Sequence, residues 1–245
     1  MRLSVFFVVI IGLLLSRFGF AEDDSQLKDP FASGPPIVTQ MPAYSQWTIT
    51  YTYGDLPKPP VPASGAPSNA PLSQRPLRVV VTKTDSVRHE EEDLEQNLES
   101  NLWVDGDVMV EQKPRNPELN AYMATAAAKN NDFPQLDWVS RSTFVGIESQ
   151  QGRKCLVYKA SVDLLEIIDP YAYKFGLQAK SEVPVTAYVD LQTRYPVLLQ
   201  FEATSLEYTM NPAPSVSLVM PDEFAKAAAA MKARIQAAIP HPARP

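Results

Sequence analysis

Hydrophobic and polar residues alternate along several short stretches of this chain, which is the pattern of strands with one buried side. The clearest stretch runs from Trp47 to Tyr53, where Trp47, Ile49, Tyr51 and Tyr53 fall on one face and three threonines on the other. Further strands are expected over residues 77–84, 143–149, 154–162, 183–190, 196–203, 205–210 and 215–220. Because consecutive strands are joined by short connections, the pattern predicts an antiparallel sheet.

The stretch from Val87 to Leu102 fits two structures. Its content of Glu, Leu and Gln suits a helix, whereas the alternation over residues 87–91 and the neighbouring strands suit an extended hairpin, which we favour. Next, residues 102–104 and 108–110 flank Asp105-Gly106, a pair that readily adopts the positive φ of a tight hairpin turn.

Two segments are expected to be helical. Residues 117–129 are rich in alanine and follow Asn116, so they predict a short helix. A C-terminal helix should begin at Pro221, with acidic residues at the positive end of its dipole, and end at Pro240, leaving a tail over residues 240–245. Its apolar residues recur at helical spacing and form one stripe that can pack on the sheet: Phe224, Ala228, Met231, Ile235 and Ile239.

The two ends and one internal stretch differ from this pattern. Residues 1–21 combine Arg2, an apolar run from Leu3 to Leu15 and small residues ending at Ala21, which predicts a cleaved signal peptide and an exported protein, soluble in the periplasm or outside the cell. Residues 22–43 are polar and Pro-rich and predict a flexible N-terminal segment. The remaining residues, 44–239, are expected to form a single domain with a Pro-rich loop over residues 56–76.

Composition narrows the classes of partner. The chain has a formal net charge of −6, and removal of residues 1–21 would take away two arginines and no acid. An acidic protein is a poor match for nucleic acid and for anionic lipid surfaces, since both attract clusters of Lys and Arg. Cys155 is the sole cysteine, so no intrachain disulfide can form, and its place in an apolar strand favours burial.

The order of elements resembles the periplasmic lipoprotein-carrier superfamily, the LolA/LolB-like fold. The residues that carry the resemblance are Trp47-Thr48-Ile49-Thr50-Tyr51 as an opening strand, Leu102-Trp103-Val104-Asp105-Gly106 as a central hairpin, Phe144-Val145-Gly146-Ile147 leading through Gly152-Arg153-Lys154-Cys155 into a strand, and the hairpin from Ala187 to Val197. This resemblance implies a mainly β (α+β) fold, in which a curved antiparallel sheet forms an unclosed half-barrel around a hydrophobic cavity, with a few helices and the C-terminal helix packed on it. The implied partner is a lipid, an acyl chain or a lipoprotein, and no cofactor is implied.

Two departures from that family are visible. One is the long Pro-rich loop over residues 56–76, and the other is that no motif can be assigned to recognition of a lipoprotein partner. The resemblance therefore implies a cavity that binds an apolar ligand, and it does not identify that ligand.

The sequence gives little evidence for catalysis or for a metal site. It contains no Gly-x-Ser-x-Gly elbow, Ser-x-x-Lys set or Cys/His signature of a nucleophilic enzyme. A metal site needs converging ligands, and the chain offers only two histidines, His89 and His241, and one cysteine. The acids that follow His89 are interpreted as a solvated face rather than a calcium site. We therefore expect a non-enzymatic protein without a metal.

Aromatic and aliphatic residues of the expected strands are candidates for an apolar site. Six are expected to face the cavity or the core beneath it: Trp47, Tyr51, Trp103, Phe144, Leu198 and Tyr208. The apolar insert between Asp163 and Glu182 fits either a lid over the cavity or an ordinary helix that completes the core. Its candidate lid residues are Leu164, Ile167, Tyr171 and Phe175.

Two functions are consistent with these features. The first is binding of an apolar ligand or a lipidated partner in the half-barrel. The alternative is a module of the cell envelope that docks or senses another protein on the same fold, without bound lipid.

Overall fold

The computed structural model describes residues 29–32, 34–54, 75–95, 97–124, 126–168 and 181–238. Residues from Gly34 onward belong to one compact unit, and the turn at residues 29–32 belongs to another. In that turn the Phe31 amide donates to Asp29 Oδ1 over 2.9 Å. The expected signal peptide at 1–21, most of the Pro-rich loop at 56–76 and the tail at 240–245 lie outside the described residues.

Eleven strands of the described residues form one sheet in the order β6-β5-β4-β3-β2-β1-β11-β10-β9-β8-β7. Every neighbouring pair is antiparallel. The strands are β1 (Tyr44–Tyr53), β2 (Pro76–Thr84), β3 (Val87–Leu94), β4 (Leu98–Asp105), β5 (Val108–Gln112), β6 (Leu119–Met123), β7 (Phe144–Gln150), β8 (Arg153–Asp163), β9 (Glu182–Asp190), β10 (Pro196–Phe201) and β11 (Thr204–Asn211). Since β6 and β7 are the two edges, the sheet is not closed, and the expected mainly β fold is confirmed.

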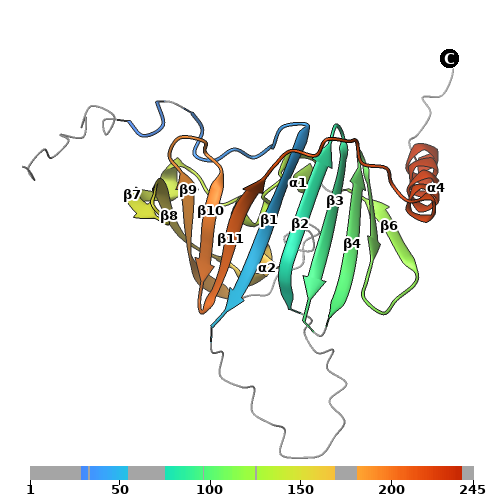
Figure 1. Cartoon of the computed structure of the whole chain (residues 1–245), viewed down its shortest axis with the longest axis horizontal. Coiled ribbons are helices and arrows are strands. Elements are labelled where there is room, and N and C mark those ends of the chain that lie inside the picture. The colour runs from blue at the N-terminus through green and yellow to red at the C-terminus, as the bar shows by residue number, and fades with distance from the viewer. Residues whose placement is uncertain are drawn as a thin grey trace, which may run out of the picture. The chain divides into compact units, whose positions relative to one another are not determined.

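The sheet bends, and its two faces have different neighbours. In Figure 1 the strands at both ends turn away from the viewer, α1 (Ala126–Asn130) and α2 (Leu164–Ile168) lie behind the sheet, and α4 (Asp222–Ala238) lies beside β4 and β6. Two short 3-10 helices, η2 (Pro134–Leu136) and η3 (Arg141–Thr143), follow α1. We call the face toward residues 126–143 the inner face, the opposite one the outer face, and residues 126–143 the cap.

Pairing register assigns side chains to these faces, because directly opposed residues of an antiparallel pair point to the same side. Trp47 pairs with Val81, Val81 with Glu90, and Glu90 with Leu102. Trp47 contacts Phe133 of the cap, so all four residues face inward. The alternation expected for β1 is confirmed, with Trp47 and Ile49 buried and Thr50 and Thr52 exposed.

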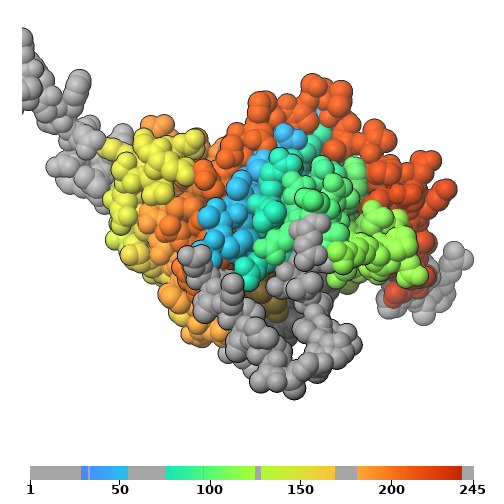
Figure 2. Space-filling model, turned by 60° about the horizontal axis from the view of Figure 1, so that its bottom comes forward, coloured from blue at the N-terminus to red at the C-terminus, as the bar shows by residue number. Residues whose placement is uncertain are grey.

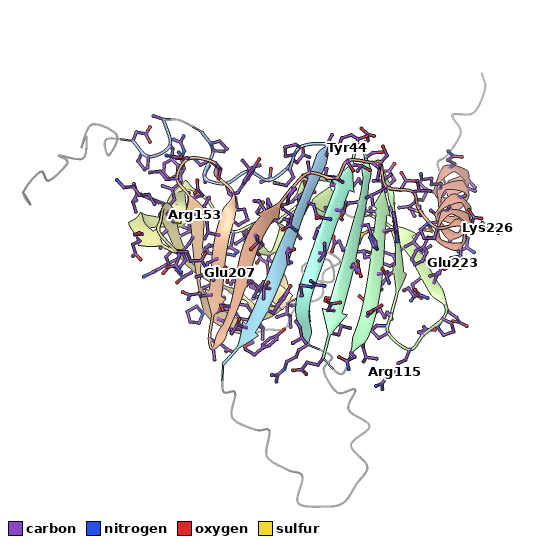
Figure 3. The ribbon with its side chains drawn as sticks, in the orientation of Figure 1. Tyr44, Arg115, Arg153, Glu207, Glu223 and Lys226 are labelled. Carbon is purple, nitrogen blue, oxygen red and sulfur yellow. The ribbon has the colours of Figure 1, made fainter. Side chains whose placement is uncertain are left out.

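The C-terminal helix packs on the outer face. Phe224 and Ala228 are buried against Trp103, Val108 and Val110, with Met231 and Ile235 partly buried beside them. Lys232 Nζ lies 2.6 Å from Asp105 Oδ2 and ties the helix to the β4–β5 turn. Figure 3 shows Glu223 and Lys226 on α4, and both side chains are exposed. The expected stripe is thus confirmed as far as Ile235, while Ile239 lies outside the described residues.

The stretch from 87 to 102 is extended, as we favoured. It forms β3 and β4, and the chain between them turns at Asn97, whose φ is 55°. The next hairpin turns at Gly106, with a φ of 59°, which a glycine adopts at little cost. Both expectations about these hairpins are confirmed.

The helix expected over 117–129 is wrong in its first half. Residues Leu119–Met123 form strand β6, and only Ala126–Asn130 are helical. The reason is tertiary: β6 pairs with β5, and its Leu119 and Ala121 pack beneath α4. Pairing and burial therefore outweigh the local helical preference of alanine.

The strand expected over 215–220 is also wrong. These residues form an irregular connection between β11 and α4. The Leu218 amide donates to the Thr84 hydroxyl over 2.9 Å, so it does not join a backbone ladder. Val216 and Val219 are exposed on this connection.

The segment expected to be flexible is packed over residues 34–43. Ile37 and Met41 are buried, and the Val38 amide donates to the carbonyl of Arg194 over 3.0 Å. The Tyr158 hydroxyl donates to the carbonyl of Pro36 over 2.8 Å. This segment therefore spans from β8 to the start of β1 along one rim of the sheet, as Figure 1 shows.

Candidate functional site

Three aromatic rings join the inner face to the cap. Phe133 of the cap lies between Trp47 of β1 and Tyr208 of β11, with ring centroids 5.4 Å from Trp47 and 5.9 Å from Tyr208. Trp47 and Tyr208 are brought together because Tyr208 pairs with Ile49, two residues along β1. All three side chains are buried, with at most 3% of the residue exposed.

Two polar atoms in this cluster have no hydrogen-bond partner among the residues that the structure describes. They are the indole Nε1 of Trp47 and the hydroxyl of Tyr208. A buried polar group without a partner costs about 1–3 kcal/mol, because it loses its hydrogen bonds to water. The cluster therefore offers one N–H donor and one hydroxyl, which donates or accepts, at a site that gains from a polar partner.

Two further tyrosines, Tyr51 and Tyr53, extend this polar region along the inner face. Burial raises the pKa of Tyr51 well above its usual value, and Tyr208, Glu92 and Glu90 raise it further. Burial also raises the pKa of Tyr53 to about 12, although Arg75 above its ring opposes the shift. Glu92 of β3, which faces the same side of the sheet as both tyrosines, contributes to both shifts.

A buried ionic group fastens the cap to the sheet. Asp132, next to Phe133, accepts hydrogen bonds from Lys83 Nζ at 2.7 Å, from Arg88 Nη1 at 3.0 Å and from the Met41 amide at 2.7 Å. Arg88 Nε also lies 3.0 Å from Glu90 Oε1. The group joins β2, β3, the N-terminal segment and the cap at one point.

The six candidate site residues lie on both faces of the sheet. Trp47, Tyr51 and Tyr208 face inward, and Phe144 is on the same side because its ring contacts Tyr158, which is bonded to the segment at Pro36. Trp103 instead faces outward, where it stacks on His89 and contacts Phe224. Leu198 also faces outward and packs with Cys155 and Tyr188.

The lid candidates are only partly described. Leu164 is half-buried and Ile167 is buried in α2, which packs against η2 and β8. Tyr171 and Phe175 lie outside the described residues. In the described half of this insert, α2 extends the cap rather than standing apart from it.

Sequence analysis did not find Phe133, Asp132 or Arg88. The first two lie in a stretch without periodic hydrophobicity, between α1 and η2, so no pattern marks them as part of the inner face. Arg88 is a charged residue next to His89 and the acids that follow it, and nothing in the sequence marks it as buried, which it is. The only available signal was its inward position in the alternation of β3.

Two surface hollows are lined by described residues. One, of about 460 Å³, lies along residues 35–40 and Val139, and the other, of about 490 Å³, lies between β6 and α4. Both lie at margins of the sheet. Within the described part of the inner face, Phe133 of the cap lies against Trp47 of β1 and Tyr208 of β11.

Two further features of the described residues bear on the site. No three His, Cys, Asp or Glu side chains among them gather as a metal site. None of the helices in the described ranges is long and apolar enough to cross a membrane.

Comparison with known proteins gives remote likenesses. No family model matches the chain, and no protein in the curated set matches it. Among solved structures, the lipoprotein LppX of Mycobacterium tuberculosis is similar at 10% identity, with a TM-score of 0.36, over 73% of this chain and 90% of that one. LprF of Mycobacterium bovis is similar at the same identity and TM-score, over 73% and 89%. Such scores are too low to assign a shared fold or function, so both are argued from the chain itself.

Proposed function

We propose that this protein binds an apolar ligand on the inner face of its sheet, beneath the cap, and that it is exported and not an enzyme. The observation that carries the proposal is the contrast between the two faces. Strands β1, β9 and β11 alternate so that their apolar side chains point inward, whereas β8 also turns the buried Cys155 and Val157 outward. Apolar residues of the inner face include Ile49, Val79, Val81, Leu156, Val185, Ala187, Leu199 and Leu206.

The segments that cover this face are not strands of the sheet. It consists of short helices and irregular segments, which hold fewer backbone hydrogen bonds than strands do. Segments of this kind open at lower free energy than a sheet. The cap therefore supports a binding mode in which the sheet stays fixed and the cover moves.

Photolabelling tests this proposal. The probe is a sixteen-carbon fatty alcohol with a diazirine in its chain, and unlabelled alcohol serves as competitor. We expect competed labels in peptides of β1, β11 and the cap. Labels confined to the hollow between β6 and α4, or labelling that no competitor reduces, would contradict the proposal.

Two adjacent residues of β11 provide a matched pair of variants. Met210 pairs with Trp47 and is half-buried on the inner face, whereas Thr209 pairs with Thr48 on the outer face and is exposed. Met210→Lys places a charge beside the apolar surface and should reduce competed labelling about tenfold, the effect of roughly 1.4 kcal/mol. Thr209→Lys adds the same charge and should leave labelling unchanged.

The alternative, a protein-docking module, would favour an exposed apolar patch on the outer face. In the described part of that face, β1 presents threonines, and Glu207 of β11, labelled in Figure 3, is exposed. Where the outer face is apolar near β4 to β6, α4 covers it; Figure 2 shows this helix, in red, against the green strands. These observations support the ligand-binding proposal over docking.

A further inference from the structure

We infer that the place of the Phe133 ring, between Trp47 and Tyr208, is a subsite for the head of the ligand, and that it takes an uncharged oxygen of an acyl lipid, as in an ester or an alcohol. This inference rests on the proposed function and names the ligand's chemical class. The inference follows from three properties of the described inner face. Two polar atoms lack a hydrogen-bond partner there, carboxylates lie on the same face, and an aromatic ring of the cap occupies the place of the head.

The two polar atoms without a hydrogen-bond partner define which chemical group of a ligand fits. The Trp47 indole N–H can only donate, so its partner must be an acceptor such as a hydroxyl, carbonyl or ester oxygen. The Tyr208 hydroxyl can donate to that oxygen or accept from a neighbouring hydroxyl. A purely apolar ligand would leave both atoms without partners, which gives a polar head an advantage.

The charges on the same face disfavour an anionic head. Glu90 and Glu92 face inward on β3 and are near enough to Tyr51 to raise its pKa. Of the nearby cations, Arg88 lies 3.0 Å from both Asp132 and Glu90, and Lys83 lies 2.7 Å from Asp132. A carboxylate or phosphate at the subsite would therefore share the inner face with two carboxylates, which lie two strands away from Trp47 and Ile49, and this repulsion favours an uncharged head.

Phe133 supplies the place that the head would take. Its ring contacts both Trp47 and Tyr208 but cannot satisfy their polar atoms as a ligand oxygen would. Phe133 stands on an irregular stretch of the cap, between α1 and η2, rather than on a strand. Rotation of the ring away from Trp47 and Tyr208 would free the subsite without breaking a strand pair or the ion pairs of the neighbouring Asp132.

The test compares two lipids that share a twelve-carbon chain. Monolaurin carries an uncharged glycerol ester, and laurate carries a carboxylate; both are titrated calorimetrically into the full chain at pH 7.5, below their aggregation concentrations. We expect monolaurin to bind on the order of tenfold more tightly. Tyr208→Phe, which removes one hydroxyl, should weaken monolaurin about three- to tenfold and leave laurate unchanged.

Tyr158→Phe is the matched control. Tyr158 is also buried on the inner face, but its hydroxyl is already bonded to the Pro36 carbonyl. Its removal should lower stability and leave the ratio of the two affinities unchanged. Tyr208→Phe should not lower stability, because the buried hydroxyl that it removes has no hydrogen-bond partner within the described ranges.

A second pair of variants tests the part played by the ring. Phe133→Ala should tighten binding of monolaurin, since the subsite no longer has to be vacated, and leave that of laurate unchanged. Phe224→Ala removes a similar buried ring, which contacts Trp103 on the outer face, and should not tighten either.

The outcomes distinguish failure of this inference from failure of the proposed function on which it rests. Equal affinities in the wild type, or an affinity ratio that Tyr208→Phe leaves unchanged, would overturn this inference while apolar binding stands. If neither lipid binds the wild type or Phe133→Ala, both the inference and the proposed function are overturned.

Discussion

Replacing Asp132 with asparagine removes the charge that joins the cap to the sheet. The Asp132 side chain is 3% exposed, and its two cationic partners, Arg88 and Lys83, are 5% and 17% exposed. Loss of one partner from a buried ion pair costs about 3–5 kcal/mol. Since Arg88 keeps its contact with Glu90 at 3.0 Å, we expect the lower end, about 3 kcal/mol.

Asp93→Asn is the matched control for this substitution. Asp93 pairs with Arg78 at 2.8 Å, but the two side chains are 38% and 54% exposed, so its loss should cost less than about 1 kcal/mol. The free energy of unfolding of both variants is measured by urea titration. Hydrogen exchange should also rise over residues 34–43 and 131–139 in Asp132→Asn alone. Equal losses of stability in the two variants, with unchanged exchange, would refute the role assigned to Asp132.

Two further predictions concern the tyrosines and a close backbone approach. Burial raises the pKa of four tyrosines that face inward, namely Tyr51, Tyr53, Tyr158 and Tyr208. The stability that they contribute is full below the unfolded value near pH 10 and is lost as the pH rises through their folded values. Absorbance at 295 nm should therefore show these four ionising together with alkaline unfolding, whereas ionisation of all ten tyrosines near pH 10 in the folded protein would contradict their burial. A Cβ at Gly54 would lie 2.7 Å from the backbone oxygen of Ala203, so Gly54→Ala should lower the melting temperature, whereas Gly146→Ala, in open space on β7, should raise it slightly. A neutral Gly54→Ala would show that these two segments are not in contact.

Local patterns predicted much of this fold. Alternation over residues 47–53 reports directly which side chains share a face, and Asp105-Gly106 marks its turn by backbone chemistry alone. The segments that failed depend on distant partners. Residues 119–123 are a strand because β5 pairs with them and α4 covers them, and residues 215–220 are irregular because Thr84 takes the Leu218 amide.

The site could be predicted only in part, because a face of the sheet is defined across several strands. Trp47 and Trp103 both belong to alternating strands, but the register through β2 and β3 places them on opposite faces. Phe133 and Asp132 reach the inner face through the path of the cap, which no periodicity encodes. Phe133 therefore emerged as a site residue only from its contacts with Trp47 and Tyr208.

Native mass spectrometry of the gently purified protein, followed by organic extraction, tests the central claim most directly. The account predicts a stoichiometric adduct that extraction releases and that proves to be an apolar molecule. A mass equal to that of the polypeptide alone, with no shift when the fatty alcohol or monolaurin is offered, would contradict binding on the inner face.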